Sequence, residues 1–417
     1  MKKSLLYLFL IGLVLGCSKD ADNPDQPEQD FTVILDVDQD HSFGRHTVSA
    51  SAFLSNQNGD ILVSGELHSG QTTILTANVD PSLFYDLTYV IHDNNEDLNE
   101  STYRLVTFSA VQQGSYTLGP TEELENSYDE IFLNFANTGY PCEIVASNSG
   151  RGTFGPQNGG YLNWQSNLVD SPTSNFYMAL KSPNDLFGRY IWLEDVAEGS
   201  SFNLDYMALP QIQDTLRIDI PDNENIGFQL CGMVGSSQNQ HPLAYGNLVN
   251  GASSLFVAVP QDIFNQYVLE LQYRNGNDTN FFTSKTSAIP SVVQPSELNI
   301  LVNDPSPQNF KMQLEGDGIL YNVIFGNANA SGTLFVFHSI YGQAASEVTF
   351  SKENLRLNIQ QQYPDLSQME TVLAERASIS SYSELNGYND ILNYLISRED
   401  YGGSNMNGSI EVLTKEF

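Results

Sequence analysis

Short runs in which apolar and polar residues alternate recur along the chain, and this period of two restricts the fold more than any other feature. In the first run, Phe31, Val33, Leu35 and Val37 take every second position. Successive side chains of a strand point to opposite faces, so the pattern predicts a half-buried strand. Similar runs follow at spacings of about ten residues, with turn sequences such as Asn58-Gly59-Asp60 between them. The sequence therefore predicts an all-β fold of tandem antiparallel β-sandwich domains.

Polar stretches rich in Gly, Pro, Asn and Ser divide the chain into candidate domains. The middle domain is either one large sandwich or two small ones, and the sequence leaves both open. The expected divisions are a signal peptide at 1–16, a disordered tether at 17–30, a β-sandwich at 31–138, a β-rich domain at 139–305 and a β-rich domain at 306–417.

The last domain contains a segment with a different period. Between residues 386 and 398 the apolar side chains recur at intervals of three and four, which predicts one C-terminal amphipathic helix. A helix with a single apolar stripe needs a surface to cover, so we expect it to pack on the sheet of the last domain or to cover an exposed sheet edge. The apolar residues are Tyr388, Ile391, Leu392, Leu395 and Ile396.

The N-terminus has the features of a secretory signal. Lys2 and Lys3 precede an apolar run from Leu5 to Leu15, which is too short to span a bilayer permanently. The stretch Val14-Leu15-Gly16-Cys17 resembles the bacterial lipobox, in which a cysteine directly follows the cleavage site, although Val14 and Leu15 depart mildly from its commonest order. The resemblance implies that Cys17 is the lipidated first residue of the mature protein. The other interpretation is an ordinary secretory signal followed by a chance cysteine.

The segment after the cysteine is polar and has nothing large to bury, so we expect residues 18–30 to form a disordered tether. Its start, Lys19-Asp20-Ala21-Asp22, resembles the acidic export signal of surface lipoproteins of the Bacteroidota. That resemblance implies a lipid-anchored protein of the outer membrane that faces outward.

The charge balance restricts the partners of the chain. Lys and Arg together number 17 against 50 Asp and Glu, which gives a formal net charge of -33. Nucleic acids require clustered basic residues, so we expect no nucleic-acid partner. Anionic headgroups are also repelled, so attachment to the membrane has to come from acyl chains.

Two cysteines remain after Cys17, namely Cys142 and Cys231. Each lies among apolar or small neighbours. In an oxidising compartment they could form a disulfide, and they could equally be buried free thiols.

Asp36, Asp38 and Asp40 have the spacing that opens a calcium-binding loop. His41 stands where an EF-hand needs glycine and Thr47 stands where it needs glutamate, so that motif fails. A looser Ca²⁺ site and a solvated strand end are the two remaining interpretations, and no other cofactor is expected. No serine-nucleophile, zinc or nucleotide motif is found, which makes an enzyme the less favoured class.

Aromatic residues of the middle domain lie among amides and carboxylates. Tyr161, Trp164, Tyr190 and Trp192 have the composition of a sugar-binding surface, in which rings cover sugar faces and amides bind hydroxyls. The structural alternative is that Tyr190 and Trp192 belong to a strand buried between two layers.

Asp214-Thr215-Leu216 is similar to the short O-glycosylation sequence of exported proteins of the Bacteroidota. The resemblance implies that Thr215 carries a glycan. This modification would fit the expected compartment.

These features together predict a lipid-anchored surface protein that acts as a binding or assembly component. It would capture glycan or protein, or serve as an accessory subunit of an envelope complex. A surface hydrolase of polysaccharide or protein is one alternative, and a deep cleft with two close carboxylates would favour it. A structural adhesin or stalk is the other.

Overall fold

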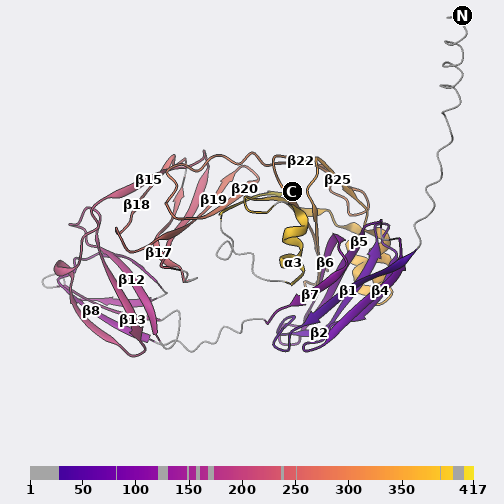
Figure 1. Cartoon of the computed structure of the whole chain (residues 1–417), viewed down its shortest axis with the longest axis horizontal. Coiled ribbons are helices and arrows are strands. Elements are labelled where there is room, and N and C mark those ends of the chain that lie inside the picture. Colours follow the sequence, from indigo (N-terminus) through magenta and orange to yellow (C-terminus); the bar gives the residue numbers. More distant parts are fainter. Residues whose placement is uncertain are drawn as a thin grey trace, which may run out of the picture.

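The computed structural model describes residues 28–80, 82–120, 130–147, 150–155, 160–167, 173–235, 239–249, 251–385, 387–397 and 408–417. Figure 1 shows an arch of β-sheets, with β1, β2 and β4 in one foot, β8, β12 and β13 in the other, and β15 to β22 across the top. Within the described residues no helix is long and apolar enough to cross a bilayer.

The N-terminal foot is a sandwich whose small layer is the sheet β4-β1-β7. β1 (Gln29–Val37) pairs antiparallel with β4 (Thr72–Val79) and parallel with β7 (Gly114–Leu118). Val33 and Leu35 of this layer lie in one core with Leu87 and Tyr89 of the opposite layer.

The opposite layer belongs to a twelve-stranded sheet, counted over the described residues, which continues across the arch. Regions far apart in the sequence therefore share one sheet: β6 pairs parallel with β24, and β20 pairs with β27. In spatial order its strands are β17 (His241–Val249), β16 (Asn225–Met233), β19 (Gln266–Asn275), β20 (Asp278–Thr286), β27 (Gly408–Glu416), β26 (Ala374–Tyr382), β23 (Leu320–Ala328), β24 (Leu334–Gln343), β6 (Glu100–Val111), β5 (Tyr85–Asn95), β2 (Thr47–Asn56) and β3 (Ile61–Glu66).

The two faces of this sheet are covered by different elements. α3 (Tyr388–Ser397) and the layer β4-β1-β7 cover one face, and α2 (Glu353–Gln360) packs on the other together with the 3₁₀ helix η2 (Pro364–Thr371). The second face also carries the sheet of β21 (Asn299–Asp304), β22 (Phe310–Glu315) and β25 (Glu347–Phe350). Because both faces are covered, residues 85–91 of β5 are all buried.

The other foot is a sandwich of two sheets around a core that includes Leu133, Leu162 and Met178. Its first sheet consists of β10 (Gly150–Phe154), β11 (Tyr161–Asn167), β8 (Glu130–Ala136) and β14 (Ser201–Asp205). Its second sheet consists of β13 (Arg189–Ala197), β12 (Thr173–Lys181) and β9 (Glu143–Ala146). The 3₁₀ helix η1 (Tyr206–Ala208) leads to β15 (Thr215–Asp219) and β18 (Ser254–Ala258), a pair that packs on a separate core with β16 and β19.

The structure confirms the predicted all-β class with tandem sandwiches and a C-terminal amphipathic helix. The helix buries its apolar stripe, since Ile391 and Ile396 are completely buried. It contacts β6 and β7, which lie in the predicted first domain, and shares one core with residues of β26 and β27. The sequence did not indicate α2, or the parallel pairs that accompany the antiparallel ones. The predicted domain boundaries stay predictions, and the long sheet crosses those near residues 138 and 305.

Candidate functional site

The two sheets of the sandwich at residues 130–209 differ in what covers their outer faces. Tyr177, Ala179, Tyr190 and Trp192 of the sheet β13-β12-β9 point outward and pack on the core of β15 to β19. The outer face of β10-β11-β8-β14 has no such cover among the described residues, because its central residues Asn163 and Asn203 are exposed. We call this second surface the amide face.

The strand register builds a polar row across the middle of the amide face. Thr153 of β10 lies opposite Asn163 of β11, which lies opposite Asn134 of β8, which lies opposite Asn203 of β14. Residues directly opposite in neighbouring strands point to the same side of a sheet. With strands about 4.8 Å apart, the row extends about 14 Å.

Two exposed aromatic rings flank this row on the central strands. Tyr161 pairs with Ala136 on one side of the row, and Phe132 pairs with Gln165 on the other. The two residues are 47% and 40% exposed, respectively. Four residues of strand separate the two levels, which places the rings about 13 Å apart along the strand direction. The face thus alternates apolar ring, polar row and apolar ring.

Hydrogen bonds between neighbouring strands hold part of this surface. Arg151 donates through Nε and Nη2 to Oε1 of Gln165 at 3.0 and 2.8 Å. The Nδ2 amide of Asn134 donates to Oδ1 of Asn203 at 3.2 Å. Within the described residues the Asn163 side chain makes no hydrogen bond, so its two donors and its acceptor remain available to a ligand.

Asp205, the last residue of β14, fixes one end of the face. Its Oδ1 accepts the Asn137 amide at 3.0 Å and the Met207 backbone N–H at 3.0 Å, and it thereby caps η1. These two hydrogen bonds, with that from Asn137 the larger effect, lower the pKa of the exposed Asp205 carboxyl. The residue therefore carries a negative charge beside Tyr161 and Ala136.

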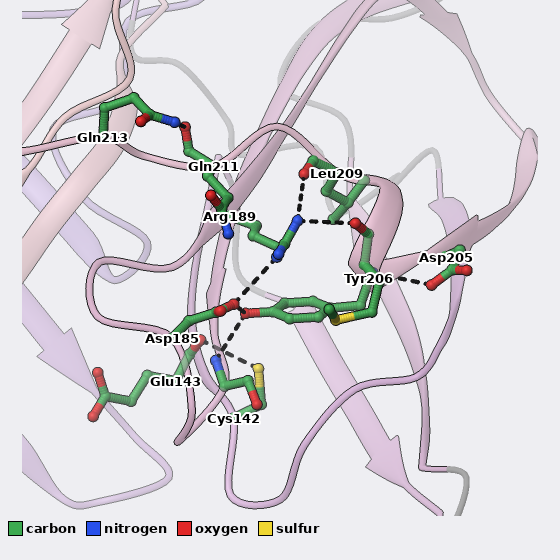
Figure 2. Close-up of polar contacts among 11 residues, drawn as sticks. Cys142, Glu143, Asp185, Arg189, Asp205, Tyr206, Leu209, Gln211 and Gln213 are labelled. Carbon is green, nitrogen blue, oxygen red and sulfur yellow. Dashed lines mark hydrogen bonds and ion pairs between the residues drawn. The ribbon is translucent and has the colours of Figure 1, made fainter.

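A buried ionic network secures the chain just after Asp205 (Figure 2). Arg189 donates to Oδ2 of Asp185 at 3.2 Å, and also to the carbonyl oxygens of Met207 and Leu209 at 3.0 and 2.9 Å. Tyr206 donates its phenol proton to the same Asp185 oxygen. Burial, followed by this hydrogen bond, raises the pKa of Tyr206, so the phenol stays protonated. The network ties η1 to the β12–β13 turn and to the start of β13.

The structure does not gather the four predicted aromatic residues into one surface. Tyr161 lies on the amide face, whereas Trp164 points the other way and packs on the sandwich core. Trp192 is edge-on to His241 and Phe264 at 5.1 and 5.6 Å, in the junction between the sandwich and β17. Tyr190 packs on the same junction core. The interpretation of a strand between two layers therefore applies to Tyr190 and Trp192.

The other predicted residues lie apart from the amide face. The Asp36 carboxylate accepts a hydrogen bond from the Thr72 hydroxyl, and the Asp38 carboxylate accepts one from the Asp40 backbone N–H. In the part of the chain described, no group of three or more His, Cys, Asp or Glu residues could hold a metal ion. Thr215 begins β15, is half-buried and donates its N–H to Asp214. Cys17 lies outside the described residues.

Cys142 and Cys231 do not form the disulfide that was one of the two interpretations. Both are free thiols, Cys142 half-buried just before β9 and Cys231 buried in β16. Burial raises the pKa of each thiol to about 11, so both are weak nucleophiles at neutral pH.

A concave surface in the N-terminal foot is the main competing site. A cavity of about 630 Å³ is lined by residues that include His41, Phe43, His68 and Tyr363. Ser51 and Tyr363 are hydrogen-bonded at 3.0 Å in its wall, and Nδ1 of His41 lies 2.6 Å from the Gly119 carbonyl oxygen. These polar groups of the cavity wall are thus engaged within the fold.

Comparisons with known proteins give no family and only distant structural likenesses. No family model and no curated protein matches the chain. Among solved structures it is similar to α-2-macroglobulin from Escherichia coli (9% identity, 87% of this chain and 23% of that one, TM-score 0.14). It thus spans about a quarter of that relative. A fimbrial assembly protein from Parabacteroides distasonis is also similar (9% identity, 69% of this chain and 96% of that one, TM-score 0.11). So is the Bacillus anthracis TIE protein (10% identity, 90% of this chain and 72% of that one, TM-score 0.14). With such TM-scores these likenesses carry no argument on function.

Proposed function

We propose that the chain is a lipid-anchored outer-membrane surface protein that binds glycan through the amide face. The observation that carries this proposal is the row Thr153, Asn163, Asn134 and Asn203 between the exposed rings of Tyr161 and Phe132. Amides and hydroxyls both donate and accept, as sugar hydroxyls do. An exposed ring offers the apolar surface that covers the C–H face of a sugar.

The charge of the face indicates the kind of glycan. The row and its two flanking rings are uncharged. Arg151, in the edge strand β10, lies beyond the row on one side, and Asp205, in the edge strand β14, lies beyond it on the other. A ligand lying along the row therefore meets amides and hydroxyls rather than a strong field of one sign, although the whole chain carries a net charge of -33. A neutral oligosaccharide fits this arrangement better than a polyanion.

A glycan array probed with the full mature chain tests the proposal. We expect the wild type to bind neutral oligosaccharides. Asn163→Ala removes an uncommitted amide from the centre of the row, and the expected loss is about fivefold in affinity, since a hydrogen bond of this kind contributes about 1 kcal/mol. Asn78→Ala, at an exposed position of β4 in the N-terminal foot, is the control and should bind as the wild type does, although its amide also donates to Glu28. Absence of any bound glycan, or an equal loss in both variants, would overturn the proposal.

The membrane anchor is a separate element of the proposal and rests on the lipobox resemblance. Cys17→Ala is expected to release the protein from the membrane fraction, because the acidic chain has no affinity of its own for anionic lipid. Fractionation of the native cell with metabolic labelling by palmitate measures this. A Cys17→Ala variant that stays labelled and membrane-bound would contradict the anchor and leave the glycan proposal intact.

A further inference from the structure

A lysine and an aspartate meet in the interior of the N-terminal foot. Nζ of Lys352 lies 2.5 Å from Oδ2 of Asp86, and their side chains are 8% and 2% exposed. Asp86 belongs to β5, and Lys352 immediately precedes α2, 266 residues further along the chain. The two reactive groups are thus held in contact and largely out of water.

The backbone around Asp86 has an unusual form that serves its carboxyl group. The pairing of β5 with β6 is irregular between Tyr85 and Leu87, which are the neighbours of Asp86. Across this irregularity Ala110 has a φ of +56°, a left-handed conformation that alanine adopts rarely. In that conformation its N–H donates to Oδ1 of Asp86 at 3.1 Å. A backbone donor therefore polarises one oxygen of the carboxyl group, while the lysine contacts the other oxygen.

Two buried titratable groups beside the pair are uncharged. His338 is buried near Lys352, and burial followed by the lysine charge lowers its pKa to about 3, so the imidazole is neutral. Its Nε2 lies 2.8 Å from Oγ1 of Thr107. Tyr321 is also buried, and burial followed by the charge of Asp86 raises its pKa, so its phenol keeps its proton. The pair therefore lies beside two buried groups that keep their neutral forms.

We infer that Lys352 and Asp86 condense to an intramolecular amide between Nζ and Cγ. A proton first passes from the ammonium group to Oδ2 within the pair. The nitrogen lone pair then attacks Cγ, and the Ala110 N–H stabilises the negative charge that develops on Oδ1. The Cγ–Oδ2 bond breaks, and Oδ2 leaves as water with the proton it received and a second proton from the nitrogen. One C–N bond replaces one C–O bond, one water is released, and no oxidant or co-reactant is needed.

The position of this bond suggests its use. The N-terminal foot joins the rest of the long sheet through the parallel pair β6 and β24. An amide between β5 and the segment before α2 links the two sides of this junction covalently. Such a bridge would keep the foot folded when tension is applied through the N-terminal segment that precedes β1.

Peptide mapping of the full mature chain purified from native membranes tests the inference. Trypsin requires a free lysine side chain, so we expect no cleavage after Lys352. A branched peptide should instead join the Asp86 and Lys352 segments, with a mass one water below the sum of its two parts. Lys415 and Asp278, an ion pair at 3.3 Å with side chains 27% and 33% exposed, provide an internal control that should yield separate peptides.

An Asp86→Ala variant is expected to restore cleavage after Lys352 and abolish the branched peptide. The wild-type result alone decides the inference if this variant does not fold. Complete cleavage after Lys352 in the wild type, with separate peptides of full mass, would show a permanent ion pair and overturn the inference.

Discussion

Replacing Arg189 by methionine removes the cation of the network shown in Figure 2 and keeps most of the side-chain length. The substitution leaves the Asp185 carboxylate without its charged partner, and leaves the carbonyl oxygens of Met207 and Leu209 without a donor. The Arg189 and Asp185 side chains are 8% and 18% exposed, so solvent screens their interaction only weakly. Removing one partner of a buried ion pair costs about 3–5 kcal/mol, and we expect the free energy of unfolding of this sandwich to fall by that amount.

The chain provides both a local probe and a control for this measurement. Its two tryptophans, Trp164 and Trp192, lie in β11 and β13 of the same sandwich, so their fluorescence during urea unfolding reports on this unit. Arg217→Met removes the same kind of Arg–Asp contact from a surface pair that is 60% and 47% exposed. Such a pair contributes at most about 1 kcal/mol.

We therefore expect a much lower urea midpoint for Arg189→Met than for Arg217→Met. Because the network fixes the chain after Asp205, Arg189→Met should also weaken glycan binding at temperatures where the sandwich remains folded. Equal midpoints for the two variants would refute the argument that the buried network stabilises this sandwich and its amide face.

Two further predictions concern the N-terminal foot and the last sheets. The pKa of His338 is lowered to about 3 in the fold, against about 6.5 in the unfolded chain. Between these two pH values the unfolded state binds more protons than the folded state. The free energy of unfolding therefore falls as the pH falls from about 6.5 to about 3. Denaturation midpoints across this range should show a weaker pH dependence in His338→Phe, whereas His68→Phe, at an exposed site, should keep the wild-type slope. Phe310 is completely buried against Phe325 and Phe350. Phe310→Ala should therefore lower the free energy of unfolding, measured by pulse proteolysis, by about 3–5 kcal/mol. Phe256→Ala, at a residue that is 65% exposed, should lower it little, and equal losses in the two variants would contradict the packing.

Local patterns in the sequence predicted most of the strands and the last helix, because each of these depends on a period that one segment contains. α3 has five apolar residues at helical spacing, and all five are buried. α2 has only eight residues, and its buried side includes Arg356 as well as Leu355 and Ile359, so its apolar stripe is too short to read. The pairing of β6 with β24 joins residues more than 200 positions apart, and no local pattern contains that information.

Part of the candidate site could be predicted from the sequence. Alternation along a strand places Tyr161 and Asn163 on one face and Trp164 on the other, so composition alone should not have grouped Tyr161 with Trp164. The partners Asn134 and Asn203 follow only from the register of β11 with β8 and of β8 with β14. Likewise, the contact between Asp86 and Lys352 depends on how distant segments pack, and neither residue belongs to a motif.

Hydroxyl-radical footprinting with a glycan selected from the array tests the location of the binding site most directly. Tyr161 and Phe132 are exposed in the free protein, so both are oxidised readily, and we expect the bound glycan to lower both rates. Tyr245 and Phe256, 62% and 65% exposed on other sheets, are matched aromatic controls whose rates should not change. Unchanged oxidation of Tyr161 and Phe132, with protection at the exposed His68 in the cavity of the N-terminal foot, would contradict the assignment of the amide face as the glycan site.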